Sequence, residues 1–313
     1  MQAIGDNLDS LLLDYEEKMS QSILLIGSNG QVGTELQKIL NSYGNTVAVA
    51  RPTIDMTKPD TLCSIIREKK PQIIINAAAY TAVDKAESEV GAAMAVNGIA
   101  PGILAEEADK LGAFLVHIST DYVFDGNNSR PYIETDPLAP LSVYGKTKLA
   151  GEEAIQKFCT NYVILRTAWV YGTYGKSNFI KTMLRLGGER EELRVVADQI
   201  GSPTWARDIA DAIARILPQL SPEMTGIYHY TNSGVASWYD FAVTIFEEAQ
   251  QLGCPLKVQR VVPISTSEYP TPAHRPSYSV LSCAKITKVL GTYPPYWRQS
   301  LRQMIKELLV VSG

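Results

Sequence analysis

The sequence predicts an α/β fold in which a doubly wound parallel sheet carries a smaller C-terminal lobe. Three observations lead to this prediction. A glycine-spaced turn joins an apolar strand to an amphipathic helix near residue 22, strand and helix patterns alternate as far as residue 167, and the alternation loosens beyond that point. Strands that alternate with helices are typical of a parallel sheet covered by helices on both faces.

The first pair of elements surrounds a turn of the form G-x-x-G-x-x-G. An apolar run over 22–26 ends at Gly27, the turn continues with Gly30 and Gly33, and Gly44 ends the helix that follows. Gly27 permits a sharp turn, Gly30 lets backbone N–H groups approach a pyrophosphate, and Gly33 lets the helix pack close to the strand. This context indicates a dinucleotide site of the Rossmann type. An ordinary β–α turn with glycines for geometry alone is the alternative.

The next elements continue the alternation. Thr57 and Pro59 predict the start of a helix that Pro71 ends, and three consecutive isoleucines over 72–76 indicate a strand buried on both faces. Pro101 predicts a break or kink in a long helix over 88–111. The other expected elements are strands over 46–50, 114–119, 162–167, 193–196 and 227–231, and helices over 142–158, 179–186, 208–217, 237–252 and 296–310.

These patterns divide the chain into three parts. An acidic N-terminal extension covers residues 1–19 and is assigned no function. The expected NAD(P)-binding Rossmann domain covers 20–166 and about 192–232, and the expected substrate-binding lobe covers 167–191 and about 233–313. We expect the lobe to close over the carboxyl edge of the sheet, where ligands of such folds bind.

Composition argues against several classes of protein. The net charge of −4 offers no broad basic face for nucleic acid or an anionic membrane. Four cysteines lie far apart without a C-x-x-C pair, so the sequence suggests neither zinc nor a redox dithiol. No apolar run reaches membrane-spanning length. We therefore expect a cytoplasmic protein that binds neither nucleic acid nor membrane.

Tyr144 and Lys148 lie four residues apart on the helix expected over 142–158, so both project from one face. A tyrosine with a pKa near ~10 holds its proton too tightly at neutral pH, and a nearby ammonium would lower that pKa. A decrease of about 3 pKa units corresponds to about 4 kcal/mol. The pair predicts a general acid–base. On spacing alone, a half-buried tyrosine beside a solvated lysine is the stronger alternative.

Thr120 follows the strand at 114–119, where its hydroxyl could bond the oxygen that Tyr144 protonates. With Tyr-x-x-x-Lys and the glycine turn, this threonine makes residues 20–313 resemble the extended short-chain dehydrogenase/reductase family. Five motifs narrow the resemblance to its dTDP-4-dehydrorhamnose reductases: NAAAYTAVDKAE at 76–87, HISTDYVFDG at 117–126, PLSVYGKTKLAGE at 140–152, RTAWVYG at 166–172 and ADQIGSPT at 197–204.

This resemblance implies NADPH-dependent reduction of the C4 ketone of dTDP-4-dehydro-β-L-rhamnose to dTDP-L-rhamnose, in deoxysugar biosynthesis for cell-surface polysaccharides. Tyr144 would protonate O4, Lys148 would tune Tyr144 and hold the nicotinamide ribose, and Thr120 would orient the carbonyl. Similar sugar-nucleotide 4,6-dehydratases carry an Asp-Glu pair after the threonine. Here Tyr122 follows Asp121. A neutral phenol is a poor base, so reduction is favoured over elimination.

The resemblance also implies contacts with the substrate, and it raises the question of a metal. Asp121 and Trp169 would lie against the sugar, and Arg275 could hold the nucleotide diphosphate. A core aromatic and a loop anchor are the respective alternatives for Trp169 and Arg275. Asn97 could reach an active-site water or lie on a helix surface. Some relatives bind Mg²⁺ between subunits, but a solvated charged face is the simpler interpretation of four carboxylates in this chain: Glu189, Glu191, Glu192 and Glu307.

Arg51 bears on the choice of cofactor. NAD enzymes usually place Asp or Glu about 20 residues past the glycines, to bind the ribose 2′-OH. Here that place holds Arg51, and a guanidinium suits a 2′-phosphate. The sequence thus predicts a preference for NADPH, with NADH usable; a solvated surface arginine is the alternative. The expected cofactor-binding residues are Gly27, Asn29, Gly30, Gln31, Val32, Gly33, Arg51, Asp55, Met56, Ala78, Ala79, Tyr80, Thr81, Ile118, Tyr144 and Lys148.

Two other functions compete with the reductase. A non-catalytic regulatory subunit would keep the fold and cofactor, but the intact Thr120, Tyr144 and Lys148 argue against it. A nucleotide-sugar epimerase would keep its cofactor bound and show no net oxidation. The protein is expected to be a monomer or homodimer, with no metal ligand assigned. His117, His229 and His274 are scattered, so core packing is their default interpretation.

Overall fold

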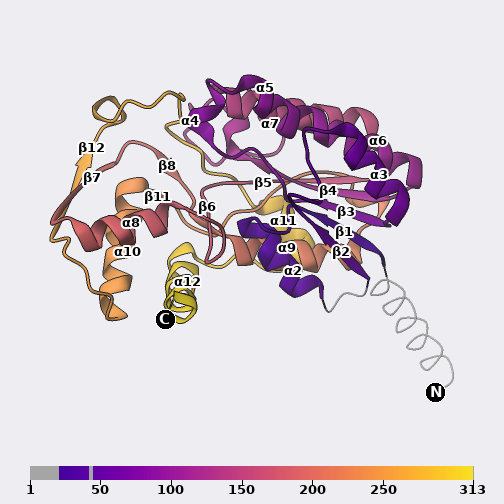
Figure 1. Cartoon of the computed structure of the whole chain (residues 1–313). Coiled ribbons are helices and arrows are strands. Elements are labelled where there is room, and N and C mark those ends of the chain that lie inside the picture. Colours follow the sequence, from indigo (N-terminus) through magenta and orange to yellow (C-terminus); the bar gives the residue numbers. More distant parts are fainter. Residues whose placement is uncertain (1–20, 42–44, 313) are drawn as a thin grey trace, which may run out of the picture.

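A computed structural model describes residues 21–41 and 45–312 of the 313-residue chain. The extension expected over 1–19 and the expected helix end at Tyr43 and Gly44 lie outside the described residues. Six parallel strands form the central sheet (Figure 1). In spatial order they are β10 (Gly226–His229), β5 (Tyr162–Thr167), β4 (Phe114–Thr120), β3 (Ile73–Asn76), β1 (Ile23–Ile26) and β2 (Thr46–Val49).

The strand order fixes where a ligand can enter the sheet. The chain passes from β1 outward to β2, then crosses back over β1 to β3 and continues toward β10. The order therefore reverses between β1 and β3. In open α/β sheets, ligands bind at such a switch point, beyond the carboxyl ends of the strands. The predicted doubly wound parallel sheet is confirmed.

Helices cover both faces of this sheet. Along β1, Ile23 and Leu25 point to one apolar core and Leu24 and Ile26 to the other, and all four are buried. One face packs against α2 (Gln31–Leu40), α9 (Ala206–Ile216) and α11 (Ala284–Leu290). The other face packs against α3 (Pro59–Lys69), α6 (Ala100–Leu111) and α7 (Val143–Phe158), as the two layers of Figure 1 show.

A smaller lobe lies beside the sheet (Figure 1). Its core joins α8 (Phe179–Glu189), α10 (Trp238–Gln251) and α12 (Trp297–Ser312) to β7 (Glu192–Val196), which pairs in parallel with β12 (Arg260–Ile264). Short strand pairs lie around it: β6 (Val170–Tyr171) with β9 (Thr204–Trp205), and β8 (Ile200–Gly201) with β11 (Ala236–Ser237).

Two details of this lobe differ from the expected division of the chain. The strand expected at 193–196 was placed with the Rossmann domain, but β7 pairs with β12 in a separate two-stranded sheet, outside the six-stranded one. Conversely, Ile286 and Leu290 of α11 belong to the core beneath the main sheet, although the lobe was expected to include them. The pairing of β7 with β12 and the packing of α11 against the main sheet both join segments that are distant in sequence. These contacts determine to which part of the molecule β7 and α11 belong.

The helix expected over 88–111 is divided into three segments. α5 (Val90–Met94) passes through a π-helical segment, η1 (Ala95–Ile99), into α6, and Pro101 stands in the first turn of α6. Proline lacks the N–H that a continuous α-helix needs, so the backbone pattern changes just before it. A short helix precedes them, α4 (Val83–Ala86). Thr57 does not cap α3: Lys58 occupies that position without a side-chain bond.

Short 3-10 segments complete the described elements: η2 (Asp121–Val123), η3 (Leu217–Gln219), η4 (Pro222–Met224) and η5 (Thr266–Glu268). Among the helices within 21–41 and 45–312, none combines the length and apolarity that a membrane span requires.

Candidate active site

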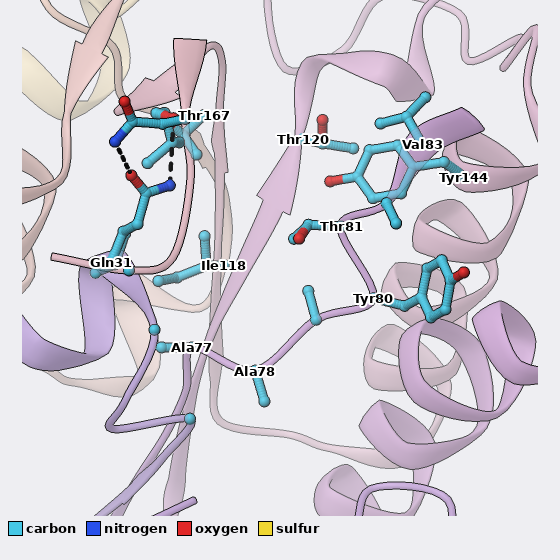
Figure 2. A pocket seen from close by; sticks show the side chains of 18 of the residues that line it. Gln31, Ala77, Ala78, Tyr80, Thr81, Val83, Ile118, Thr120, Tyr144 and Thr167 are labelled. Atoms are coloured by element: carbon cyan, nitrogen blue, oxygen red, sulfur yellow. Dashed lines mark hydrogen bonds between the residues drawn. The ribbon is translucent and has the colours of Figure 1, made fainter. Parts of the chain in front are cut away.

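A cleft of about 960 Å³ opens at the carboxyl ends of β1, β3, β4 and β5 and extends to the smaller lobe. Figure 2 shows the part of its wall between the glycine turn and α7. Nearly all the residues singled out from the sequence line this cleft: Gly27, Asn29, Gly30, Gln31, Val32, Arg51, Met56, Ala78, Ala79, Tyr80, Thr81, Ile118, Thr120, Asp121, Tyr144, Lys148, Trp169 and Arg275. Gly33 and Asp55 are not part of its wall.

The glycine turn is shaped by close backbone contacts. Gly27 has φ +86°, and a Cβ there would lie 2.6 Å from the backbone nitrogen of Ala78. A Cβ on Gly33 would lie 2.0 Å from the carbonyl oxygen of Gly27, so α2 can pack this close to the turn only because Gly33 has no side chain. The N-cap of α2, Gly30, makes no side-chain cap bond, and the first turn contains no acidic residue. Its N–H groups therefore suit an anionic diphosphate.

Gln31 connects this turn to the edge of the smaller lobe. Its Nε2 donates to the carbonyl oxygen of Val170 (3.5 Å), and its Oε1 accepts from Nδ2 of Asn178 (2.9 Å), as the dashed lines in Figure 2 show. Asn178 also caps α8 by accepting from the backbone N–H of Lys181. No local pattern connects Asn178 with residue 31, so it could not be singled out from the sequence.

Arg51 and Asp55 lie after β2 and differ in their surroundings. Arg51 is exposed at the edge of the cleft, and its contact with a 2′-phosphate stays a prediction. The Asp55 carboxylate accepts from the backbone N–H (3.0 Å) and hydroxyl (2.8 Å) of Thr57. These bonds lower the pKa of Asp55 and direct its side chain into its own loop. Asp55 thus shapes the loop that carries Met56 to the cleft.

Asn97 holds the loop after β3 in place. Its Oδ1 accepts from the backbone N–H of Tyr80 (2.8 Å), and its Nδ2 donates to the Tyr80 carbonyl (3.0 Å). The side chain is buried, which rules out the helix-surface alternative for Asn97, and its contact with an active-site water stays a prediction. The Tyr80 ring points away from the cleft in Figure 2, and its hydroxyl donates to Glu89 (2.7 Å). Tyr80 therefore borders the cleft mainly through its backbone.

Tyr144 stands in the first turn of α7, which Ser142 caps by accepting from the N–H of Gly145 (3.2 Å). Figure 2 shows its hydroxyl directed from α7 into the cleft, toward Thr120 at the end of β4. Burial raises the pKa of Tyr144 far above its ordinary value, and the Thr120 hydroxyl opposes that rise. The phenol is thus a neutral proton donor beside the end of β4.

The Lys148 side chain is held by two groups of β4. Its Nζ donates to the carbonyl oxygen of Ile118 (2.7 Å) and lies 3.1 Å from Nε2 of His117. Burial lowers the pKa of Lys148 to about 8, against the opposing charge of Glu152. Burial has the largest effect on the pKa of Tyr144. The expected tuning of Tyr144 by Lys148 stays a prediction.

Polar groups without hydrogen-bond partners among the described residues lie in the cleft at the carboxyl ends of β4 and β5. Thr120 donates to Oδ1 of Asp121 (2.9 Å), whereas Oδ2 of Asp121 and Oγ1 of Thr167 are buried with no hydrogen-bond partner among the described residues. Burial raises the pKa of Asp121 to about 6, and the hydroxyls of Ser279 and Thr120 limit the rise. Such unpaired groups fit hydroxyls of a bound ligand. Thr167 was not singled out from the sequence.

Trp169 lies at the junction with the smaller lobe. Its backbone has φ 48°, and its indole stacks on Trp238 of α10 with ring centroids 3.6 Å apart and planes 3° apart. Gly201 lies against the same indole, because a Cβ there would come within 2.4 Å of Trp169 Cε2. Trp169 therefore combines core packing with a place in the cleft wall. Trp238 lines the cleft as well and was not singled out from the sequence.

Arg275 is a loop anchor that also lies at the cleft. Its guanidinium pairs with Asp84 (2.7 Å) and donates to the Tyr122 hydroxyl (3.1 Å), so it anchors the proline-rich loop to α4 and η2. It also borders the cleft, so its contact with a nucleotide diphosphate stays a prediction. Tyr122 packs edge-on against the ring of Tyr144, with centroids 5.4 Å apart.

The remaining carboxylates and histidines lie elsewhere. Glu189 pairs with Arg185, Glu192 with Arg260 and Glu307 with Arg207. Over 21–41 and 45–312, no three His, Cys, Asp or Glu residues gather as a metal site. His117 and His229 are buried, as core packing requires, and His274 is exposed.

Comparison with known proteins agrees with this geometry. The family model of the RmlD substrate binding domain matches residues 21–310. The chain belongs to this family. It is 47% identical over 295 residues to the dTDP-4-dehydrorhamnose reductase of Burkholderia thailandensis, covering 92% of this chain and 99% of that protein. The reductase of Escherichia coli K12 is 44% identical over 298 residues, covering 93% and 99%.

Two solved structures share the fold of this chain. The dTDP-4-dehydrorhamnose reductase of Bacillus anthracis, in complex with NADP, has a TM-score of 0.85 and 39% identity, covering 92% of this chain and 99% of that one. A UDP-glucose 4-epimerase of Thermotoga maritima has a TM-score of 0.78 at 18% identity, with 93% and 100% covered, which reflects the fold alone. The resemblance to the extended short-chain dehydrogenase/reductase family and its dTDP-4-dehydrorhamnose reductases is confirmed.

Proposed function

We propose that this chain is an NADPH-dependent oxidoreductase that reduces the C4 ketone of dTDP-4-dehydro-β-L-rhamnose to dTDP-L-rhamnose. The observation that carries the proposal is the Tyr144 phenol, directed into the cleft at the end of β4 beside Thr120. Identity above 40% over almost the full length of two dTDP-4-dehydrorhamnose reductases supports the substrate. NADP in the related Bacillus anthracis structure supports the cofactor.

The residues of the glycine turn fit a dinucleotide. The tight turn requires glycine at Gly27 and Gly33, where a Cβ would overlap neighbouring backbone, and the first turn of α2 offers uncapped N–H groups to a diphosphate. Arg51, exposed at the cleft edge, would pair with a 2′-phosphate. The bound nicotinamide would supply a hydride to the carbonyl carbon.

The chain's own groups would handle the carbonyl oxygen and the sugar. Tyr144 would give its phenolic proton to O4 as negative charge develops there. Thr120 would hold the carbonyl oxygen in line with that phenol. The buried, unpaired Oδ2 of Asp121 would accept from a sugar hydroxyl, and Trp169 and Arg275 would contact the sugar and the diphosphate.

Replacing Tyr144 by Phe tests the proposal directly. The variant keeps the ring and its contact with Tyr122 but removes the proton donor. We expect kcat for ketone-dependent NADPH oxidation to fall by about 10² to 10⁴-fold, while NADPH binding persists. Tyr132→Phe is the matched control, because its hydroxyl bonds Asp125 (2.6 Å) and it does not line the cleft. Unchanged turnover in Tyr144→Phe would contradict the proposal.

The choice of substrate separates the alternatives. A nucleotide-sugar epimerase would interconvert dTDP-hexoses without net NADPH oxidation, and a regulatory subunit would bind the cofactor without turnover. An assay of the purified protein with dTDP-4-dehydrorhamnose and its hexose epimers distinguishes all three functions. The assay follows NADPH by its absorbance and the product by mass spectrometry. We expect stoichiometric NADPH oxidation with dTDP-4-dehydrorhamnose.

We further propose that the protein acts in the cytoplasm as a monomer or homodimer, without nucleic acid and without a required metal. Its four free cysteines and its net charge of −4 support this proposal. The part of the chain over 21–41 and 45–312 contains no membrane-spanning helix. Size-exclusion chromatography with and without Mg²⁺ tests the oligomeric state.

A further inference from the structure

A fully buried ion pair lies one turn of α7 beyond Lys148. The Glu152 carboxylate of α7 and the Arg166 guanidinium of β5 are both 0% exposed, with 2.6 Å between Oε2 and Nη2. Nε of Arg166 also donates to both carboxylate oxygens (3.0 and 3.2 Å), and the hydroxyl of Ser119 donates to Oε1 (2.5 Å). The proposed reduction assigns no role to Ser119, Glu152 or Arg166.

These three residues stand directly beside groups of the cleft. Ser119 precedes Thr120 at the end of β4, and Arg166 is its partner in the register of β4 and β5. Glu152 follows Tyr144 by eight residues, so both project from the same side of α7. The network therefore joins α7 to the two strand ends that α7 must face for the Tyr144 hydroxyl to point toward Thr120 (Figure 2).

Polar bonds hold the side of α7 that faces these strands. Nζ of Lys148 donates to the carbonyl of Ile118, and the next turn carries Glu152. Packing of α7 in the apolar core on this face of the sheet begins only with Ile155. Apolar contacts are non-directional, whereas a guanidinium fork fixes both the distance and the angle of the carboxylate that it binds. The bonds of Glu152 therefore set where the first turns of α7 lie on β4 and β5.

The ion pair is better explained by direction than by stability. Removing two charges from water costs about as much free energy as their attraction returns, and apolar side chains of similar volume often replace such pairs without loss of stability. In addition, Nη1 of Arg166 is buried with no hydrogen-bond partner in the described part of the chain, which adds to the cost. A pair that contributes little net stability but fixes geometry suits a helix that carries a catalytic side chain.

We propose that Glu152 and Arg166 are positioning residues that hold the Tyr144 phenol in place beside Thr120. The inference rests on the proposed reduction, in which Tyr144 protonates the carbonyl oxygen. Without the pair, α7 would shift against the strand ends, and a misplacement of about 1 Å can lower a rate by roughly 10²-fold. Neither Glu152 nor Arg166 lines the cleft, so ligand binding should change little.

An apolar replacement of the pair separates positioning from stability. The double variant carries Glu152→Met and Arg166→Met and leaves the lining of the cleft as in wild type. We expect its urea midpoint to stay within roughly 1 M of wild type. We expect kcat for ketone-dependent NADPH oxidation to fall about 10 to 100-fold, while KM and the Kd of NADPH change by less than about 3-fold. Unchanged kcat, or an equal loss of NADPH affinity, would overturn the proposal.

A second pair provides the matched control. Glu248 of α10 is 1% exposed and is bound by Arg302 of α12 (2.6 Å), and neither residue lines the cleft. Glu248→Met with Arg302→Met should therefore leave kcat unchanged. An equal loss of kcat in this control would show that any lost ion pair has the same effect, which would contradict a specific role for Glu152.

The conservative variant Arg166→Lys decides the matter if the double variant does not fold. Lysine keeps the buried positive charge but lacks the planar fork that binds the carboxylate at two points. We expect kcat to fall about 10-fold with the Kd of NADPH unchanged. Wild-type kcat in Arg166→Lys would mean that charge alone is sufficient and that the fork does not position α7.

The position of the phenol can also be measured without turnover. Crystal structures of the wild type and of the double variant, or of Arg166→Lys, give the separation between the Tyr144 hydroxyl and Oγ1 of Thr120. We expect this separation to change by roughly 0.5 to 1 Å. Identical positions would overturn the inference and leave the reductase intact. A wild-type protein without turnover of dTDP-4-dehydrorhamnose would overturn the proposed function, whereas the crystallographic comparison would still decide what holds Tyr144.

Discussion

Among single residues of the cleft, Asp121 has the clearest dependence on pH. Its pKa is raised from 3.8 to about 6, mainly because the carboxyl is buried. The folded protein therefore retains a proton that the unfolded chain releases as the pH rises from about 4 to about 6. Ionisation in the folded state costs stability over this window, by up to about 3 kcal/mol for a difference of roughly two pKa units.

Replacing Asp121 by Asn should remove this cost. We expect the free energy of unfolding of Asp121→Asn, relative to wild type, to increase between about pH 4 and about pH 7 and then to level off. Urea denaturation at several pH values measures it. Asp136→Asn is the control: Arg130 holds the pKa of Asp136 below its ordinary value, so the deficit of that variant should be constant over this range. A pH-independent difference for Asp121→Asn would contradict the assignment.

Arg51 tests cofactor choice at the same scale. If its guanidinium pairs with a 2′-phosphate, Arg51→Ala should lower the ratio of kcat/KM for NADPH over NADH by about 10 to 100-fold, the equivalent of one charge-assisted bond. Arg185→Ala is a matched control, since Arg185 is exposed on α8 and pairs only with Glu189 among the described residues. An unchanged ratio in Arg51→Ala leaves the solvated-arginine interpretation standing.

Local sequence carried most of the information about the site. The glycine turn, Thr120 and the Tyr-x-x-x-Lys spacing each follow from a short motif, and those residues do meet at one cleft. His117 could be assigned only to core packing, because its contact with Lys148 depends on how β4 lies beneath α7. The stacking of Trp238 on Trp169 likewise depends on the approach of α10, which no local pattern encodes.

Among the elements, α7 depends on close contact with η1. A Cβ on Gly151 would lie 2.1 Å from the backbone carbonyl oxygen of Asn97. Gly151→Ala should therefore push α7 away, with a cost of about 1 to 3 kcal/mol, and displace Tyr144 and Lys148. A displacement of about 1 Å would lower kcat roughly 10²-fold.

Gly91→Ala provides the comparison for this prediction. A Cβ there meets no atom within 4 Å, so the change should be neutral or should stabilise α5 by up to about 1 kcal/mol. Urea denaturation and the NADPH assay measure both variants. Equal stabilities for the two alanine variants would mean that α7 is free to move.

The arrangement of elements was predictable where neighbours in sequence are neighbours in space. The buried isoleucines of β3 and the alternation of strands and helices predict the sheet. By contrast, β7 and β12 pair across more than sixty residues, and the burial pattern of β7 alone does not name its partner. The π-helical segment η1 was foreseen only as a break at Pro101, because a proline interrupts the α-helical bonds without specifying the helix type that precedes it.

At the scale of the whole molecule, the sheet and the smaller lobe are joined through α9. Its carboxylate Asp208 is buried and accepts from Nδ2 of Asn232 (2.6 Å) and from the hydroxyl of Ser300 on α12 (2.5 Å). Trp205, directly before α9, belongs to the core of the lobe, whereas Ala206 belongs to the core of the sheet. Packing is thus continuous across the junction, and we expect the two parts to unfold together.

The positions of the tryptophans make this cooperation measurable. The chain has four, Trp169, Trp205, Trp238 and Trp297, and all pack in or against the lobe core. Fluorescence therefore reports the lobe, whereas far-ultraviolet circular dichroism reports all the helices and strands. Coincident urea transitions are expected for wild type.

Ser300→Ala, which removes a donor from the buried Asp208, should shift both midpoints together and lower the free energy of unfolding by about 1.5 to 3 kcal/mol. Thr287→Ala deletes a buried hydroxyl that has no partner in the described part of the chain and should have little effect. If fluorescence changed at lower urea than circular dichroism in wild type, the lobe would be an independently unfolding unit and its junction with α9 would contribute little.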